Sequence, residues 1–248
     1  MSDIIPRLRM FAGPNSSGKS TINGVIRPEL LGVYVNPDEI EKSIRNQGGL
    51  LDLAYYEVLT SEAEILEFFQ QSALLEKTNL LNEAALLRFS DNKLNFSAIS
   101  INSYFASVTA DLIRQKLLDA KVSFTFETVM SSPDKVAFLR KAQQAGYRTY
   151  LYYVATEDPE INISRVHYRV KMGGHPVPKD KIISRYFRSL NLLKDAILYS
   201  NRAYIFDNSG QQHIFVAQVT DGHCIELKNE QMPNWFKHAI LSKIDISS

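Results

Sequence analysis

Short runs of apolar, β-branched and aromatic residues alternate along the chain with longer segments whose apolar positions recur every three or four residues. Five of the short runs are typical of buried strands, and turn or helix-start residues bound each one: 8–12, 33–36, 122–126, 147–155 and 203–207. Strands that alternate with helices indicate a parallel sheet covered on both faces. We therefore predict an α/β fold with three αβα layers around a mostly parallel, five-stranded sheet.

Prolines mark three predicted helix starts. Asn36-Pro37, Ser132-Pro133 and Asp158-Pro159 each place a side chain that can cap a helix before a proline at the first helical position. We expect a helix to begin at each of these prolines.

Two regions depart from the alternation. Residues 50–120 contain no convincing strand and carry apolar residues at helical spacing, so we predict a helical insertion that is interrupted near 90–93. Residues 213–220 and 223–227 are strand-like and are joined by Asp221-Gly222, a strong hairpin signal. We predict a C-terminal β-hairpin plus helix at about 211–248, and a single domain over 1–248.

Composition sets the class of protein. The chain has 248 residues, with 28 basic and 27 acidic side chains and a formal net charge of +1. This balance provides no basic field for nucleic acid, and no apolar run has the roughly 18 residues of a membrane span. We expect a cytoplasmic protein with neither nucleic acid nor membrane as a partner. Cys224 is the only cysteine, which excludes an internal disulfide.

The segment 13–20, GPNSSGKS, matches the phosphate-binding loop pattern G-x-x-x-x-G-K-[ST]. It follows a predicted strand and precedes a helix-like segment, 20–27, as the motif requires. In such a loop the backbone N–H groups face phosphate, Lys19 reaches the β and γ phosphates, and Ser20 holds Mg²⁺. The alternative is a Gly/Ser-rich surface turn. We predict binding of ATP or GTP with Mg²⁺ through these residues and one on a later helix: Gly13, Pro14, Asn15, Ser16, Ser17, Gly18, Lys19, Ser20, Thr21 and Arg185.

Two acidic residues follow predicted strands, at the edge where parallel sheets bind ligands. Asp38 could accept the proton of a substrate hydroxyl as the hydroxyl attacks the γ-phosphate. The alternative is structural: Asn36 and Glu39 form a capping box, and the helix dipole favours any acidic residue in a first helical turn. Glu127, followed by Thr128, could contact a substrate hydroxyl or organise Mg²⁺ through water, or it could simply mark the exit of the strand into solvent.

A pair of helices with several arginines follows. Arg165 and Arg169 are four residues apart and share a helix face. We predict that their helix ends at glycines 173–174 and that a second helix, which carries Arg185, begins after Pro178. Such a pair could close over a triphosphate and neutralise the charge that develops during phosphoryl transfer. The alternative is an ordinary basic surface hairpin.

Asp207 and Asn208 follow the last predicted parallel strand, on the same edge of the sheet. They could contact a nucleotide base or stabilise a turn, as Asx residues commonly do. The sequence leaves both alternatives open.

In this order, the motifs resemble those of the zeta-toxin-like branch of phosphate-loop kinases. The segments that carry the resemblance are 12–21, 36–40, 126–128, 165–170, 173–178 and 207–208. Zeta toxins are bacterial kinases that phosphorylate the 3′-hydroxyl of the sugar in UDP-N-acetylglucosamine, and a small antitoxin protein holds them inactive.

The resemblance implies a role for each matching residue. Lys19 and Ser20 match the nucleotide loop, Asp38 the acid proposed as base for the sugar hydroxyl, and Glu127 the acid that contacts substrate. The arginines that bind ATP phosphates match Arg165 and Arg169.

We therefore expect an ATP-dependent kinase that acts on a hydroxyl of a small molecule such as a UDP-amino sugar, with an antitoxin as a candidate partner. Well-studied toxins follow the catalytic acid with an aromatic residue and an arginine, whereas residues 39–41 here are Glu-Ile-Glu. A kinase for a different metabolite, or a nucleotide-binding ATPase or switch that acts through a protein partner, remains an alternative.

Overall fold

The computed structural model describes residues 5–24 and 26–241, and the chain divides into two compact units. The first unit is formed by Met1–Leu30 and Glu127–Ser248, and the second by Leu31–Phe126. Each unit is described by itself below.

The first unit is built on a sheet in which five strands lie in the order β10-β9-β8-β7-β1. β1, β7 and β8 run parallel, β9 is antiparallel to β8, and β10 is antiparallel to β9. Their bounds are β1 Arg7–Ala12, β7 Arg148–Ala155, β8 Arg202–Asp207, β9 Ile214–Thr220 and β10 Cys224–Leu227. The turn between β9 and β10 has positive φ at Asp221 (48°) and Gly222 (76°), as a tight hairpin requires.

Alternate residues of these strands face opposite sides of the sheet. One side is closed: Leu151, Tyr153 and Ala203 are fully buried there. On the other side Phe11, Tyr152 and Tyr204 lie in register on β1, β7 and β8, and their rings stack at centroid distances of 4.8 and 5.0 Å. Aromatic stacking therefore ties the three parallel strands together across the sheet.

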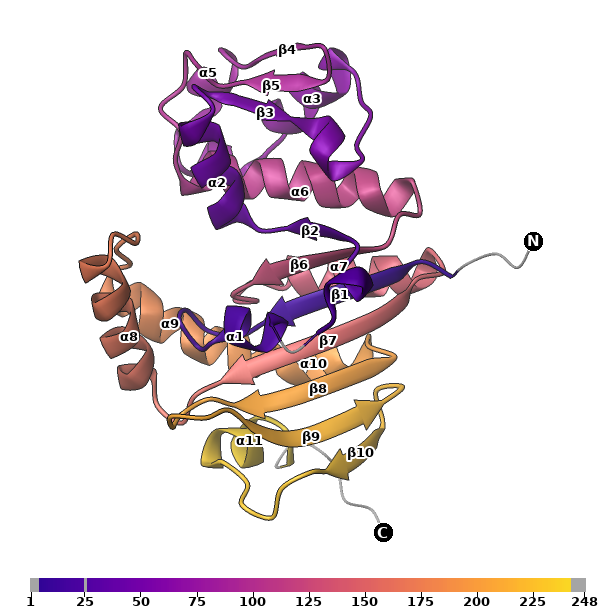
Figure 1. The fold of residues 1–248 in the computed structure, drawn as a ribbon, viewed down its shortest axis with the longest axis vertical. Helices are drawn as coiled ribbons and strands as arrows, with labels where there is room; N and C mark the ends of the chain where they lie inside the picture. Colours follow the sequence, from indigo (N-terminus) through magenta and orange to yellow (C-terminus); the bar gives the residue numbers. More distant parts are fainter. Residues whose placement is uncertain (1–4, 25, 242–248) are drawn as a thin grey trace. The chain divides into compact units, whose positions relative to one another are not determined.

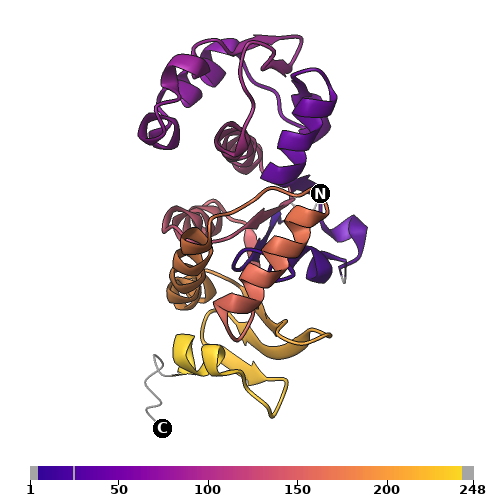
Figure 2. The ribbon, with the colours of Figure 1, turned by 90° about the vertical axis from the view of Figure 1, so that its left-hand side faces the viewer.

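Helices cover both sides of this sheet, because α1 lies in front of it in Figure 1 and α7, α9 and α10 lie behind it (Figures 1 and 2). The helices are α1 Lys19–Asn23, α7 Asp134–Gln144, α8 Pro159–Lys171, α9 Lys179–Asn191, α10 Leu193–Leu198 and α11 Asn234–Ala239, and a short 3₁₀ helix spans Pro28–Leu30. Figure 2 shows α8 and α9 as neighbouring helices, and they pack through a cluster that includes Ile163, Val166 and Ile182. The unit therefore has the three layers that its sequence predicts.

The second unit joins a parallel strand pair to helices and a small sheet. β2 pairs with the part of β6 that belongs to this unit, with Val33 opposite Phe124 and Val35 opposite Phe126. A three-stranded antiparallel sheet has the order β3-β5-β4. The bounds are β2 Val33–Val35, α2 Pro37–Asn46, β3 Leu50–Asp52, a 3₁₀ helix Leu53–Tyr56, α3 Glu62–Gln70, α4 Ala73–Lys77, α5 Leu81–Ala84, β4 Arg88–Ser90, β5 Lys93–Asn95, α6 Ser103–Asp119 and β6 Phe124–Thr128.

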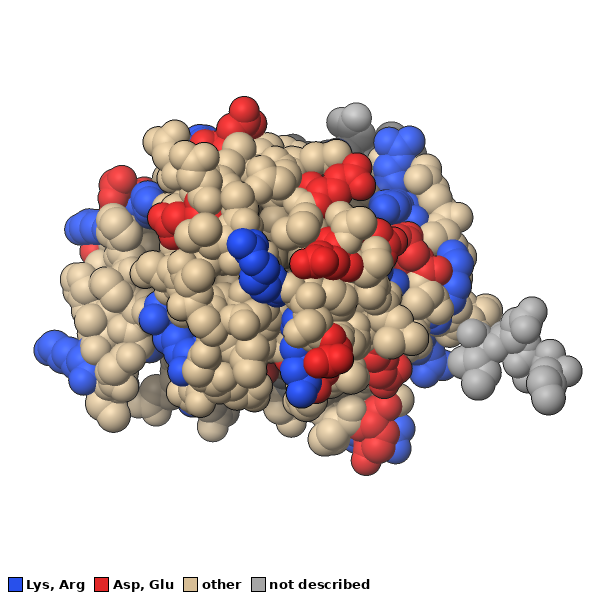
Figure 3. Space-filling view, turned by 90° about the horizontal axis from the view of Figure 1, so that it is seen from above, with Lys and Arg blue, Asp and Glu red and all other residues tan. Residues whose placement is uncertain are grey.

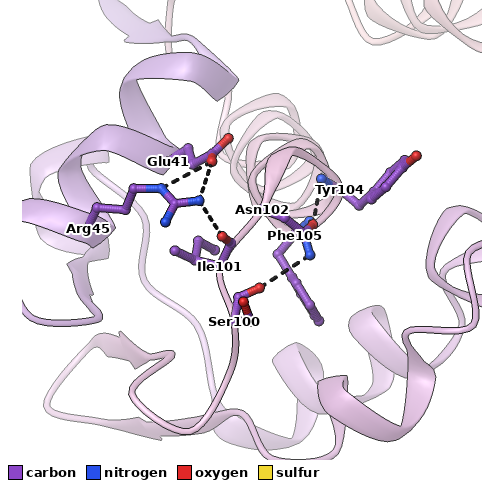
Figure 4. Close-up of polar contacts among 7 residues, drawn as sticks. All are labelled: Glu41, Arg45, Ser100, Ile101, Asn102, Tyr104 and Phe105. Carbon is purple, nitrogen blue, oxygen red and sulfur yellow. Dashed lines mark hydrogen bonds and ion pairs between the residues drawn. The ribbon is translucent and has the colours of Figure 1, made fainter. Parts of the chain in front are cut away.

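Polar contacts hold the start of α6 against α2 (Figure 4). The Arg45 guanidinium donates to the carboxylate of Glu41, one turn earlier on α2, at 2.7 Å, and to the Ile101 carbonyl oxygen at 2.5 Å. Glu41 is only 3 % exposed, so this pairing offsets the cost of burying its charge. Asn102 accepts hydrogen bonds from the backbone N–H groups of Tyr104 and Phe105 and thereby caps α6.

Most sequence predictions of secondary structure are confirmed. All five predicted strands form, the pairs β1–β7, β2–β6 and β7–β8 are parallel, and the C-terminal hairpin is present. Asn36 and Asp158 cap α2 and α8 as expected. The residues 242–248 of the predicted C-terminal helix lie outside the described residues.

Two predictions were wrong. Ser132 makes no capping bond, and α7 begins at Asp134 after Pro133. The segment 50–120 is mostly helical, but it also contains β3, β4 and β5. The predicted interruption near 90–93 is the turn between β4 and β5, where Asp91 and Asn92 have φ of 50° and 58°. The assignment of the whole chain to one domain stays a prediction.

Phe105 provides a test of packing in the second unit, because its side chain is fully buried and its ring lies 6.3 Å from that of Phe96. Phe105→Ala should lower the free energy of unfolding by about 3–5 kcal/mol, measured by urea denaturation followed by circular dichroism. Leu59→Ala, at a position that is 84 % exposed, should change it by no more than about 0.5 kcal/mol. Equal effects of the two substitutions would contradict this packing.

Candidate nucleotide-binding site

The loop between β1 and α1 passes very close to neighbouring backbone. Gly13 has φ of +142°, and a Cβ there would lie 2.0 Å from the Val154 carbonyl oxygen. Gly18 has φ of +104°, and a Cβ there would lie 2.1 Å from Nδ2 of Asn208. Only glycine fits both positions, because any side chain would collide and the backbone conformation disfavours L-residues.

Side-chain amides from two other segments hold the loop. Nδ2 of Asn162, on α8, donates to the Asn15 carbonyl oxygen at 2.7 Å. Nδ2 of Asn208, just after β8, donates to the Ser17 carbonyl oxygen at 2.8 Å. Two loop carbonyl groups are thus satisfied by protein donors and are fixed in direction.

A second set of hydrogen bonds holds the Asn162 side chain in place. Its Oδ1 accepts a hydrogen bond from the Thr156 hydroxyl at 2.6 Å, and the Thr156 carbonyl oxygen accepts one from the Tyr186 hydroxyl, also at 2.6 Å. Burial raises the pKa of Tyr186, and the nearby carboxylates of Glu157 and Asp158 raise it further, so its hydroxyl remains a donor. The chain of contacts therefore connects α9 through β7 and α8 to the loop.

Lys19 and Ser20 occupy the end of the loop. Lys19 Nζ donates to the carbonyl oxygens of Gly13 and Pro14, at 2.9 Å each, so its ammonium lies over the loop. The Ser20 hydroxyl donates to Oε1 of Glu127 at 3.5 Å, and Glu127 is 9 % exposed. An ammonium, a hydroxyl and a carboxylate are thus gathered at the start of α1.

Several buried polar atoms in this region have no hydrogen-bond partner within the described part of the chain. In the loop these atoms are Asn15 Oδ1, Ser16 Oγ and Ser17 Oγ, and on α8 they are Arg165 Nη1 and Arg169 Nε. Buried donors without partners are costly, and an anion would satisfy them. The hydroxyl and guanidinium donors, with the loop N–H groups and Lys19, fit the oxygens of a polyphosphate.

The two arginines of α8 are held loosely by backbone oxygens. Arg165 Nη2 donates to the Gly210 carbonyl oxygen and Arg169 Nη2 to that of His175, at 3.4 Å each. Gly174 leaves room for the second arginine, because a Cβ there would lie 2.7 Å from Cγ of Arg169. Long bonds to neutral acceptors leave most of the guanidinium hydrogen-bonding capacity for a stronger acceptor.

The predicted site residues fall into both units. The loop 13–21, Glu127, Thr128, Arg165, Arg169 and Arg185 belong to the first unit, and Asp38 belongs to the second. Asp38 is exposed in the first turn of α2, where its backbone N–H donates to the capping Oδ1 of Asn36. The Thr128 hydroxyl accepts a hydrogen bond from the Met130 N–H, and Arg185 lies half-buried on α9. The roles of all these residues stay predictions.

Sequence reasoning missed Asn162. Its signal was spacing, since 162, 165 and 169 follow one helix face and a buried asparagine on that face needs a partner. The contacts of Asp207 and Asn208 indicate a structural role for both residues. Asp207 accepts hydrogen bonds from Trp235 Nε1 at 2.8 Å and from the Ser209 hydroxyl at 2.7 Å. The described residues contain no group of three or more His, Cys, Asp or Glu side chains placed to hold a metal ion.

Asn162→Ala tests the support of the loop. The substitution removes the donor to the Asn15 carbonyl oxygen, so we expect the free energy of unfolding to fall by about 1–3 kcal/mol. Urea denaturation measures this, with Asn191→Ala, at an exposed position on α9, as the matched control. If both substitutions had the same small effect, the Asn162 contact would not support the loop.

Basic and acidic side chains are interspersed on the face that Figure 3 draws, without a large area of one sign. Of the helices that the structure describes, none combines the length and apolar character needed to cross a membrane.

Comparison with known proteins shows relatives at low identity. The chain is 31 % identical over 65 residues to an uncharacterized protein of Haemophilus influenzae, a match that covers 26 % of this chain and 46 % of the relative. This chain therefore spans less than half the length of that relative.

Three solved structures are similar in fold. Structures of AvrRxo1-ORF1:AvrRxo1-ORF2, one with sulphate ions and one with ATP, each match with a TM-score of 0.53 and 14 % identity, over 99 % of this chain and 67 % of theirs. A structure from the PezAT chromosomal toxin-antitoxin system of Streptococcus pneumoniae matches with a TM-score of 0.47 and 16 % identity, over 86 % of this chain and 73 % of that one. At such identities the first two matches show the fold alone.

The family model for zeta toxin matches residues 94–220. The matched segment includes Glu127, Arg165 and Arg169, together with Asn162 and Asn208, which hold the loop. It confirms the resemblance drawn from the sequence motifs. Because the match covers more than half of its 248 residues, the chain belongs to the zeta toxin family.

Proposed function

We propose that this protein is an ATP-dependent, Mg²⁺-requiring kinase that transfers the γ-phosphoryl group to a hydroxyl of a small molecule. The observation that carries the proposal is a set of buried donors on the loop and on α8 that have no partner among the described residues, namely the hydroxyls of Ser16 and Ser17, Arg165 Nη1 and Arg169 Nε. Buried donors on a glycine-rich loop at the start of a helix, and on α8, whose Asn162 contacts that loop, are suited to a triphosphate.

On the donor side, Lys19 exchanges its contacts with the Gly13 and Pro14 carbonyl oxygens for phosphate oxygens. Arg165 and Arg169 neutralise the charge that spreads over the phosphoryl oxygens as the bond to the leaving group breaks. Because Arg165 Nη1 and Arg169 Nε are buried, the attraction of these two nitrogens for phosphate is screened less than it would be at an exposed position.

Ser20 and Glu127 are the residues that would hold Mg²⁺, the serine directly and the carboxylate directly or through water. When bound, the ion would supply positive charge that offsets the negative charge of the triphosphate. The contact between the Ser20 hydroxyl and Glu127, at 3.5 Å, supports this assignment, because both oxygens belong to the ligand type that Mg²⁺ prefers.

On the acceptor side, Asp38 removes the proton from the attacking hydroxyl. Asp38 is exposed, so its carboxylate is accessible to a substrate. A UDP-amino sugar is the first acceptor to test because of the zeta toxin family. Family membership also makes a small antitoxin protein the proposed partner.

Arg165→Ala tests the role of the α8 arginines. We expect kcat to fall about a hundredfold to a thousandfold because stabilisation of the developing charge is lost. Arg188→Ala, at an exposed position on α9, should leave kcat within about twofold, and Lys19→Ala should abolish nucleotide binding. Steady-state kinetics and calorimetric titration with ATP measure these effects. An unchanged kcat in Arg165→Ala would remove the arginine from the mechanism.

Asp38→Asn tests the acceptor chemistry. We expect about a 100- to 10,000-fold loss of phosphoryl transfer with little change in ATP affinity, because the base is lost while the nucleotide loop is intact. Mass spectrometry of a metabolite extract incubated with the protein and ATP, and then with UDP-N-acetylglucosamine alone, identifies the product. Asp91→Asn, in the exposed β4–β5 turn, is the matched control. ATP consumption that needs no acceptor and survives Asp38→Asn would instead favour an ATPase or switch.

A further inference from the structure

The second unit contains a cleft of about 350 Å³ that runs along α2. One set of lining residues comes from α2 and consists of Glu39, Ser43 and Gln47. They are spaced by four residues, so they form one polar stripe along the helix. The Gln47 side-chain amide donates to the Ser43 hydroxyl at 3.2 Å, which fixes two members of the stripe relative to one another.

The remaining lining residues come from β3 and the 3₁₀ helix that follows it, and they include two adjacent tyrosines. Tyr55 is 81 % exposed, and its ring meets that of Tyr56 edge to face at a centroid distance of 5.1 Å. A tyrosine this exposed contributes little to the core, so its ring is accessible to a ligand.

Tyr56 is only 5 % exposed and lines the cleft, but its hydroxyl is not among the buried polar atoms of the described residues that lack a partner. Because Tyr56 lines the cleft, a ligand group in the cleft can exchange a hydrogen bond with this hydroxyl.

The charge in the cleft is negative. Glu39 and Asp52 line it, and the described lining residues include no lysine or arginine. One oxygen of Asp52 accepts a hydrogen bond from the Ala54 N–H at 2.9 Å, and the carboxylate can accept more. Burial raises the pKa of Tyr56 to about 12, and the charge of Glu39 contributes to this rise.

Carboxylates beside accessible tyrosine rings suit a cation that carries N–H groups, because the carboxylates accept hydrogen bonds and the rings attract positive charge. The volume lies near the lower end of ligand sites, which suits a molecule the size of a monosaccharide. We propose that this cleft binds a protonated amine of the phosphate acceptor, so that the acceptor is a small amino alcohol of amino-sugar size.

This assignment deepens the kinase proposal and rests on it. Asp38, the proposed base, directly precedes Glu39, so base and cleft share the first turn of α2. A nucleoside diphosphate would bring two negative charges to a cleft whose described charged residues are acidic. The cleft therefore favours a free amino sugar over a UDP-linked one.

The test compares molecules that differ in one charge. Calorimetric titration of the full chain would use glucosamine against N-acetylglucosamine and galactosamine against N-acetylgalactosamine, with UDP-N-acetylglucosamine as the anionic arm. We expect the amine of at least one pair to bind about tenfold or more tightly than its acetylated partner. If neither amine does so, or if the UDP-linked sugar binds most tightly, the assignment is overturned.

Tyr56→Phe is the sharpest variant, because it removes only one hydroxyl from a residue that lines the cleft. We expect unchanged or higher thermal stability and about tenfold weaker amine binding. Glu39→Gln should weaken amine binding by a similar factor and reduce the preference over the acetylated sugar, whereas Asp119→Asn, exposed at the end of α6, should change neither. Amine affinity that is unaffected by both Tyr56→Phe and Glu39→Gln would overturn the assignment.

The two proposals can fail separately. Amine binding in this cleft without phosphoryl transfer from ATP would contradict the proposed kinase activity but support the cleft assignment. Phosphoryl transfer to a neutral or anionic acceptor, with no preference for amines, would contradict the cleft assignment but support the proposed kinase activity.

Discussion

The first unit depends on how closely the loop before α1 approaches its neighbours. At Gly13 and Gly18 the space that a Cβ would need is taken by the Val154 carbonyl oxygen and the Asn208 amide. This approach brings Asn162 and Asn208 within reach of two loop carbonyl oxygens. Since those carbonyls are occupied by protein donors, the loop keeps its curl without a ligand. The strand order β1-β7-β8 makes these contacts possible, because Val154 lies on β7 and Asn208 directly follows β8.

A second constraint follows from burial. On α8, the guanidinium atoms Arg165 Nη1 and Arg169 Nε are buried without partners among the residues that the structure describes, although leaving such donors unsatisfied costs about 1–3 kcal/mol each or more for charged groups. A fold selected for stability alone would pair them with carboxylates. The cost is consistent with a site kept ready for an anion, because a phosphate that binds there regains the lost hydrogen bonds. The net charge of +1 gives no hint of this, since it averages over the whole chain.

The sequence predicted those parts of the fold that local chemistry dictates. The strands β1, β7 and β8 follow from apolar runs, and the β9–β10 turn from Asp221-Gly222, whose residues tolerate positive φ. It did not predict β4 and β5, because strands of three residues are too short to show alternation, and the Asp91-Asn92 turn was the sole local signal. The sequence could not show that Asp158 caps its helix while Ser132 does not. Capping depends on the backbone conformation just before each helix, which the sequence does not reveal. The loop was evident from its motif, whereas Asn162 required knowledge of a contact 147 residues away.

The charge in the cleft of the second unit bears on how Asp38 could work. A carboxylate is a weak base toward an alcohol, so transfer of the proton needs help from the surroundings. A protonated amine on the acceptor would supply such help, because a nearby positive charge stabilises the oxygen as it loses its proton. Glu39, Asp52 and the tyrosines would hold that amine by charge and ring contact, while Asp38 stays exposed one residue away. The bound amine would then stabilise the transition state at the reacting hydroxyl as well as the bound acceptor. A neutral sugar of the same shape would therefore have a lower kcat as well as a lower affinity.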